Sequence, residues 1–168
     1  DTLFLDHGQS LQLQYVLYDK KGGALINKTV SFFSDNYISH HEFAINDDVF
    51  DYTNNLELLW YGGLRPTEEK GDEDVQYGSG IISQGGELED IQITSPDKNF
   101  DRKVFIGQTD WAALRTKYFL SALLPDSPGS FASLSAKNMT FGPRKQTPVY
   151  NMSIGYPLDV SSFASRLY

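Results

Sequence analysis

Short runs of alternating apolar and polar residues, separated by turn signals about every ten residues, constrain the fold of this chain most. In residues 10–18, SLQLQYVLY, the side chains of Leu11, Leu13, Tyr15 and Leu17 fall on one face of an extended strand. The turn-forming letters DKKGG follow directly. Short strands at this spacing leave no room for alternating helices, so the pattern predicts an all-β domain in which one sheet packs on another.

Further runs of the same kind are predicted as strands over residues 29–34, 37–45, 56–61, 80–82, 87–94, 103–106, 130–136, 147–154 and from 160 onward. Ten tyrosines and eleven phenylalanines agree with a strand-rich fold. The highly charged residues 64–80 are expected to form an exposed loop. The 168 residues suffice for one domain with a core, and both ends look cut, so residues 1–168 are expected to be a single-domain fragment of a longer protein.

One segment departs from the alternation: residues 110–125 read DWAALRTKYFLSALLP. Trp111, Leu114 and Tyr118 are spaced as on one side of a helix, which predicts a short helix over the first eight residues. The run YFLSALL that follows is apolar at almost every position, which is typical of a strand buried on both faces. Pro125 cannot donate a hydrogen bond to a neighbouring strand and is predicted to end it.

The charge balance excludes two classes of partner. The chain carries 14 basic and 22 acidic residues, a net charge of −8, and contains no basic cluster. Nucleic acid and anionic lipid both require clustered lysine and arginine, so neither is expected as a partner. Cysteine is absent, which removes disulfides and thiolate chemistry, and no run of about 20 apolar residues predicts a membrane span.

The sequence His40-His41-Glu42 is the strongest candidate for metal or acid–base chemistry. Adjacent residues of a strand point to opposite faces, so the two imidazoles cannot bind one metal ion. His40 and Glu42 together offer at most two ligands, where zinc requires three or four, and His7 is distant in the sequence. Exposed strand histidines are therefore predicted, with no metal site and no cofactor.

Acidic residues gather at Glu68, Glu69, Asp72, Glu73 and Asp74. Their spacing does not match the alternate-residue ligand pattern of calcium-binding loops. A solvated loop is the preferred interpretation, and a docking surface for a basic partner is the alternative.

The glycine pairs and the tryptophans give no sign of catalysis either. The glycine pairs at 22–23, 62–63 and 85–86 lack the spacing of phosphate-binding loops and are predicted to be turns. Trp60 and Trp111 could stack on a sugar or a peptide, but aromatic side chains in sheet proteins usually belong to the core. The chain is accordingly predicted to be a binding module or a structural spacer, without catalytic residues.

Residues 110–125 resemble a segment of the periplasmic domain of YidC-type membrane protein insertases. That family carries a tryptophan, a Tyr-Phe pair some half-dozen residues later and a closing hydrophobic-Pro, which here match Trp111, Tyr118, Phe119 and Pro125. Three further segments are similar to the family in the same order: GQSL at 8–11, SFFSDNY at 31–37 and WYGGLRPTE at 60–68.

This resemblance implies a twisted β-supersandwich related to galactose mutarotases, with one or two short helices. It also implies a periplasmic location in a Gram-negative bacterium, within a multi-pass inner-membrane protein. The expected partners are accessory subunits of the Sec translocon and nascent membrane proteins. The family assigns no catalytic residues, cofactor or metal to this domain, so none is carried over.

Two alternatives remain from the residues themselves. A carbohydrate-binding or mutarotase-like domain is the first, although an epimerase needs a paired acid and base, and the few histidines here argue against one. Sugar binding without catalysis survives this objection. A structural spacer or adhesin domain is the second alternative.

Overall fold

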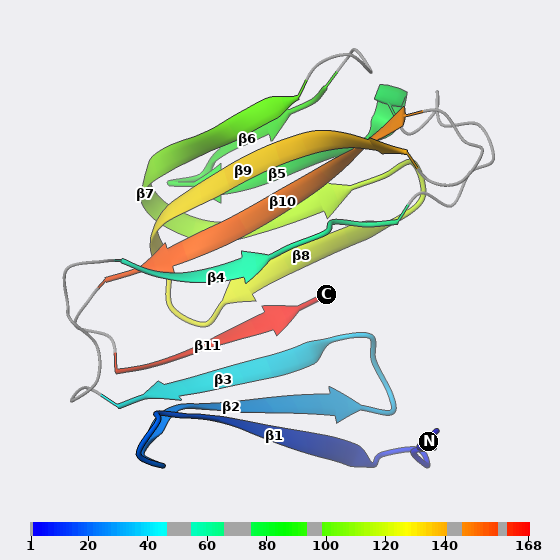
Figure 1. Ribbon diagram of the computed structural model, residues 1–168. Coiled ribbons are helices and arrows are strands. Elements are labelled where there is room, and N and C mark those ends of the chain that lie inside the picture. Colours follow the sequence, from blue (N-terminus) through cyan, green and yellow to red (C-terminus); the bar gives the residue numbers. More distant parts are fainter. Residues whose placement is uncertain (1, 47–54, 66–74, 94–98, 141–145, 158–160) are drawn as a thin grey trace.

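The computed structural model describes residues 2–46, 55–65, 75–93, 99–140, 146–157 and 161–168. Within these residues, eleven strands pair antiparallel in one strongly curved sheet (Figure 1). The strands are β1 (Ser10–Tyr18), β2 (Ala24–Phe33), β3 (Ser39–Ile45), β4 (Leu56–Trp60), β5 (Ser79–Gln84), β6 (Glu87–Ile91), β7 (Phe100–Arg115), β8 (Leu120–Pro125), β9 (Gly129–Thr140), β10 (Gln146–Tyr156) and β11 (Ser162–Leu167).

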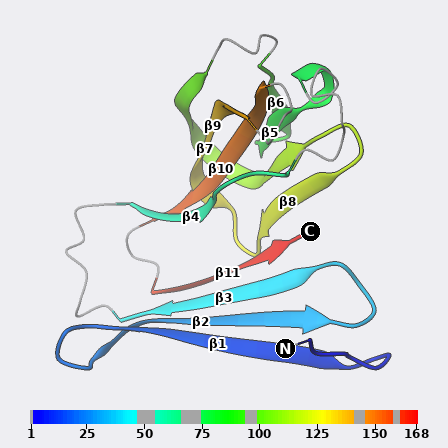
Figure 2. The ribbon, with the colours of Figure 1, turned by 45° about the vertical axis from the view of Figure 1, so that its right-hand side comes forward.

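The strand order is β1-β2-β3-β11-β8-β7-β9-β10-β4, with β5 bonded to β7 and β6 bonded to β5. Strands β1, β2, β3 and β11 lie side by side at the base of the molecule, and the remaining strands form a more compact body above them (Figures 1 and 2). We call these parts the N-terminal sheet and the main body. They meet where β11, which pairs along its whole length with β3, also pairs through residues 165–167 with β8.

The core lies in the main body. The first part of β7 pairs with β9, and its last part, from Thr109 onward, pairs with β5 and β8, so this strand is shared between two layers. The largest fully buried apolar side chains come from β5, β7, β9 and β10: Ile82, Leu114, Leu134, Met152 and Ile154. Gly155 makes room for this packing, because a Cβ atom there would lie within 1.9 Å of the Phe131 ring.

An aromatic stack joins the two parts of the molecule. The rings of Phe43 on β3 and Phe163 on β11 are stacked, with centroids 4.6 Å apart. Phe163 in turn stacks on Tyr156 of β10, with centroids 4.3 Å apart. Burial raises the pKa of Tyr156 to about 12, and the nearby Asp126 carboxylate adds to the shift. The N-terminal sheet is therefore anchored to the main body by ring packing as well as by strand pairing.

The sequence pattern predicted the strands well. The strand predicted for residues 10–18 coincides with β1, and the other predicted runs overlap β2 to β7 and β9 to β11. The charged loop is only partly described: residues 66–74, with their five clustered carboxylates, lie outside the described residues, and residues 75–77 form a short helical turn. The all-β prediction is confirmed.

The helix predicted over residues 110–117 is wrong. Residues up to Arg115 continue strand β7, where Trp111 and Leu114 point to opposite faces rather than to one side. The local sequence WAAL at 111–114 favours a helix. Hydrogen bonding to β5 on one edge and to β8 on the other outweighs this weak preference.

The apolar run after that segment is confirmed in part. Strand β8 lies between β7 and β11, is mostly buried and ends at Pro125, as predicted. Tyr118 and Phe119, however, belong to the turn before β8, with 59% and 54% of their surfaces exposed. In this turn the amide of Thr116 donates to the carbonyl oxygen of Phe119 over 2.8 Å. Across the described part of the chain, no helix is long and apolar enough to cross a membrane.

Candidate interaction surface

An apolar groove lies between the N-terminal sheet and strand β4. Its volume is about 290 Å³, close to the lower limit of small-ligand pockets. We call it the β1–β4 groove. Its lining comes from five strands: Tyr15, Leu17, Ile26, Lys28, Phe43, Ile45, Leu56, Glu57, Leu58 and Phe163.

The alternation of the strands explains this lining. In β1, Tyr15 and Leu17 share a face, and the strand register places Lys28 and Ile26 of β2 opposite them. Phe43 of β3 continues the same row across the sheet. Tyr15 and Leu17 are 55% and 54% exposed, so this apolar face is only partly covered by the rest of the protein.

Strand β4 borders the groove on one side. Three successive residues, Leu56, Glu57 and Leu58, line the cavity, although successive side chains of a strand point to opposite faces. A cavity over the face that carries the Leu56 and Leu58 side chains also touches the Glu57 main chain between them, so the groove adjoins β4 along these three residues. In the described part of the chain β4 pairs only with β10, so its other edge has no neighbouring strand.

The two charged residues that line the groove, Lys28 and Glu57, differ in their partners. The Lys28 ammonium lies 5.2 Å from the centroid of the Phe43 ring, and it forms no ion pair among the described residues. Glu57, by contrast, is already engaged: both of its carboxylate oxygens accept from Arg102, over 2.7 and 2.8 Å. Lys28 is thus the one groove-lining charge in the described residues without a partner of opposite sign.

Glu57 belongs to a polar network that fixes β4 on the main body. The Ser153 hydroxyl donates to Glu57 Oε2 over 2.9 Å and lies 2.7 Å from the Ser133 hydroxyl. Arg102 Nε donates to Ser133 Oγ over 3.1 Å, which closes the ring. The four side chains belong to β4, β7, β9 and β10, so the network holds these strands together.

A second hollow lies on the outer face of β7, β8 and β11, with a volume of about 300 Å³. Two of its lining residues, Ala113 and Ala122, are cross-strand partners. The surrounding side chains are larger: Ile38, Trp111, Leu120, Leu124, Arg166 and Tyr168. Apart from the Arg166 guanidinium and the Tyr168 hydroxyl, this hollow offers few polar side-chain groups.

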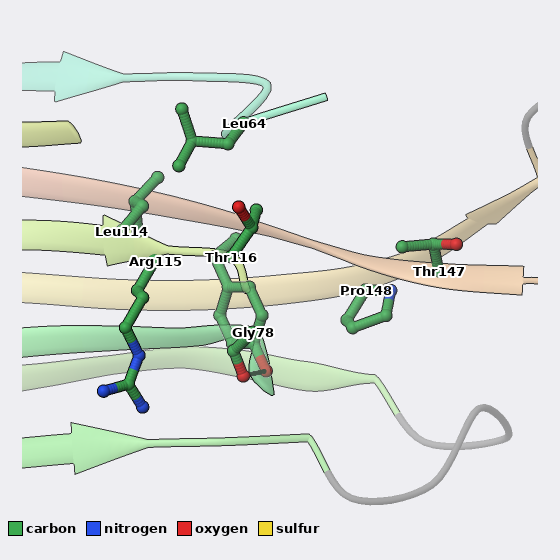
Figure 3. Close-up of a pocket in the computed structure, with 8 residues that line it drawn as sticks. Leu64, Gly78, Leu114, Arg115, Thr116, Thr147 and Pro148 are labelled. Atoms are coloured by element: carbon green, nitrogen blue, oxygen red, sulfur yellow. Dashed lines mark hydrogen bonds between the residues drawn. The ribbon is translucent and has the colours of Figure 1, made fainter. Parts of the chain in front are cut away.

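A third cavity, drawn in Figure 3, is too small for a ligand. Its volume is about 10 Å³, room for at most one water molecule. The buried Tyr150 beside it has a structural role: its hydroxyl donates to the carbonyl oxygen of Gly78 over 3.0 Å and accepts from the amide of Ile93 over 2.7 Å. Burial raises the pKa of Tyr150, so the phenol stays neutral.

The adjacent histidines point apart, as predicted. His40 lies 3.1 Å from Asp126, whose second oxygen lies 3.2 Å from Arg166 Nε. His41 lies 2.9 Å from the Ser39 hydroxyl. Both rings are half-buried, not exposed as predicted, because each side of β3 is engaged by neighbouring residues. No group of three metal-binding side chains occurs among the described residues.

The four residues that carry the family resemblance do not form one site. Trp111 lines the outer hollow, whereas Tyr118 and Phe119 lie in the exposed turn. The Lys117 ammonium lies 4.9 Å from the centroid of the Tyr118 ring. Pro125 is buried at the end of β8, opposite Ser165 of β11. Trp60, the other tryptophan, packs against the core.

Sequence reasoning placed Tyr15 and Leu17 on a common face but did not predict the groove. The groove depends on β4 and on Phe163 of β11, which are distant from β1 in the sequence. The available signal was Lys28, a charged residue in the otherwise apolar row Ala24, Ile26, Val30 and Phe32 of β2.

Comparison with known proteins identifies the family. Residues 4–161 match the YidC periplasmic domain. The chain belongs to this family. The resemblance first carried by residues 110–125 is thereby confirmed, and so is the prediction that the chain is not an enzyme, because the YidC periplasmic domain is a non-enzymatic part of an insertase. The family also places the chain on the periplasmic side of the inner membrane.

The relatives are membrane protein insertases named YidC. The protein from Prosthecochloris aestuarii is 28% identical over 83% of this chain and 24% of its own length. That from Chlorobium phaeovibrioides is 28% identical over 76% of this chain and 22% of its own length. A Coxiella burnetii relative is 29% identical over 74% of this chain and 22% of its own length. The chain thus spans about a quarter of the length of these relatives.

Among solved structures, the crystal structure of HI1317 superimposes with a TM-score of 0.51. The alignment covers 94% of this chain and 60% of HI1317, at 11% sequence identity. At this identity the likeness concerns the fold alone.

Proposed function

We propose that this chain is an interaction and positioning module of a YidC-type insertase, which supports insertion and folding of membrane proteins alongside the Sec translocon. The observation that carries the proposal is the family match over residues 4–161. The proposed partners are accessory subunits of the translocon and nascent membrane proteins, and the proposed setting is a multi-pass inner-membrane protein of a Gram-negative bacterium.

Several features of the molecule support a binding role. Two apolar hollows of about 290 and 300 Å³ lie open at its surface. Open apolar surface of this kind is typical of interaction sites. A sugar would need many hydrogen-bonding groups, and the described lining of both hollows is predominantly apolar. The module therefore fits polypeptide partners better than it fits carbohydrate.

The proposal includes the finer architecture. The strongly curved sheet and the likeness to HI1317 are compatible with a twisted β-supersandwich, with residues 1–168 as one domain of the longer protein. Trp111, Tyr118, Phe119 and Pro125 are proposed as its family-hallmark structural residues. In this role they shape the β7–β8 hairpin and the adjoining β11, through which the N-terminal sheet joins the main body.

Site-specific photo-crosslinking in the complete insertase tests the partners. A photoreactive residue is introduced in turn at Tyr37, Tyr61 and Ile106, which lie far apart in the sequence and are 95%, 80% and 88% exposed. Crosslinks to a Sec subunit from at least one position are expected, whereas the buried position Leu134 serves as the matched negative control.

Absence of any Sec crosslink from all three positions, in cells actively inserting membrane proteins, would contradict the proposed partnership. The gene that encodes the chain gives an independent check. It is expected to continue into about five hydrophobic segments of roughly 20 residues each, as membrane-spanning helices require.

A further inference from the structure

We infer that the β1–β4 groove binds an extended, apolar polypeptide segment, which adds to the free edge of β4 and places an acidic side chain against Lys28. The inference rests on the proposed function and makes it more specific: it names the chemistry of the chain that the module would hold. Three features of the groove carry it.

The first feature is the apolar face of β1. Tyr15 and Leu17 are more than half exposed although they lie beside the half-buried Ile26 and Phe43. Burying such side chains is favourable by about 25 cal/mol per Å² of apolar surface removed from water. Binding of an apolar occupant over this face is therefore favourable.

The second feature is the edge of β4. Leu56, Glu57 and Leu58 all line the groove, and in the described part of the chain β4 pairs only with β10, so its other edge is unpaired. An unpaired edge offers alternating N–H and C=O groups, and an extended peptide satisfies them by strand addition while alternate side chains enter the groove. A fatty acid or another acyl chain has no main-chain groups to use this edge, so a peptide fits the groove better.

The third feature is the charge. Lys28 is half-buried over the Phe43 ring and unpaired among the described residues, whereas the Glu57 charge is compensated by Arg102. The nearby His41 has a lowered pKa, caused first by burial and then by Lys28, which keeps its imidazole neutral near pH 7. The groove thus presents one net positive charge in a chain of net charge −8. A carboxylate is the complementary group, and a single acidic residue limits repulsion by the rest of the domain.

Peptide titration of the 168-residue chain tests the inference. The probe is a fluorescently labelled nine-residue peptide with Leu and Thr alternating and Asp at the central groove-facing position. Its matched variants carry Lys at that position, or N-methyl groups on alternate amides, which block strand addition. We expect the Asp peptide to bind at least about tenfold more tightly than either variant, since one charge pair or a few lost hydrogen bonds account for such a factor.

Variants of the chain locate the site. Leu17→Asp is expected to weaken binding of the Asp peptide at least about tenfold, because it places a carboxylate in the groove. Val16→Asp is the matched control: Val16 adjoins Leu17 in β1, is 39% exposed and points to the opposite face. It is expected to change affinity less than about twofold. Lys28→Glu is expected to reverse the preference, so that the Lys peptide binds more tightly. Circular dichroism confirms that each variant is folded.

Four results would overturn the assignment. These are equal effects of the Leu17 and Val16 substitutions, an N-methylated peptide that binds as well as its parent, a charge preference unchanged by Lys28→Glu, and binding of laurate without binding of any peptide. Sec crosslinks that persist while these peptide experiments fail would reject the groove assignment alone. Loss of the Sec crosslinks would instead reject the proposed function.

Discussion

The main body and the N-terminal sheet are built from the same kind of alternating strand, yet they bury their apolar faces to very different degrees. In the main body, Leu134 and Ile154 have at most 1% of their surface exposed. In the N-terminal sheet, Tyr15 and Leu17 of β1 are more than half exposed on the face where a core would be expected. Both parts have the same alternation of apolar and polar residues, but the apolar face of β1 is much more exposed than the apolar faces of β9 and β10.

This difference separates stability from binding. A buried apolar side chain has already contributed its transfer free energy to folding, whereas an exposed one can contribute it when a partner arrives. The main body should therefore determine the stability of the domain, and the N-terminal sheet should tolerate substitution while controlling binding. The predictions below test this division, beginning with the largest expected effect.

Leu134→Ala should produce the largest loss of stability. Leu134 is fully buried in β9 and packs against Gly80 of β5, so its truncation leaves a cavity that the surrounding strands cannot fill. We expect the free energy of unfolding to fall by about 2–5 kcal/mol. Urea denaturation followed by tryptophan fluorescence measures it. A loss below about 1 kcal/mol would show that the main body is not the rigid part.

Tyr150→Phe should have a smaller effect in the same region. The substitution removes a hydroxyl that bonds both the Gly78 carbonyl and the Ile93 amide, and leaves these main-chain groups buried without that partner. We expect a loss of about 1–3 kcal/mol, measured by the same denaturation. Tyr15→Phe is the matched control, since its hydroxyl takes part in no hydrogen bond among the described residues and the side chain is 55% exposed. An equal loss for both would contradict the comparison.

The sequence predicted the individual strands better than their partners. Alternation is a local property, so residues 10–18 were assigned correctly from letters alone. The end of β7 was assigned to a helix because its local preference is helical, and its strand conformation depends on β5 and β8, which pair with it from either side. At the end of β7, pairing with strands distant in the sequence outweighs the local helical preference.

The groove was beyond sequence reasoning for a related reason. Its apolar row on β1 was predicted, but its lining also includes Phe163, which the pairing of β11 with β3 brings beside Phe43. Nothing in the sequence of β11 indicates that this C-terminal strand pairs with β3, near the N-terminus. The exposure of Tyr15 and Leu17 likewise depends on the order of all the strands and not on any one segment.

Leu17→Ala should hardly affect stability. The side chain is 54% exposed at the end of an edge strand, so its truncation removes little buried surface. We expect a change of less than about 0.5 kcal/mol in the free energy of unfolding. The same variant should bind the Asp-containing peptide several-fold more weakly. A stability loss comparable with that of Leu134→Ala would show that the face of β1 already belongs to the core.

The pH dependence of His41 should give the smallest effect. Burial, followed by the charges of Lys28 and His40, lowers the pKa of His41 below its ordinary value of 6.5. The unfolded chain therefore binds a proton more readily than the folded one. The contribution of His41 to stability is complete above pH 6.5 and is lost as the pH falls from 6.5 through the lowered pKa of the folded state. His41→Gln should remove this part of the pH dependence.

The comparison with Lys28 makes the test specific. Lys28→Met should raise the pKa of His41 in the folded chain, since it removes the second cause of the shift while preserving an apolar stem over Phe43. An NMR titration of the His41 ring measures this pKa directly. If the pKa does not move, the Lys28 charge does not reach His41 across the groove face. The ammonium would then be too well solvated to select a carboxylate, and the N-terminal sheet would offer apolar surface without charge selectivity.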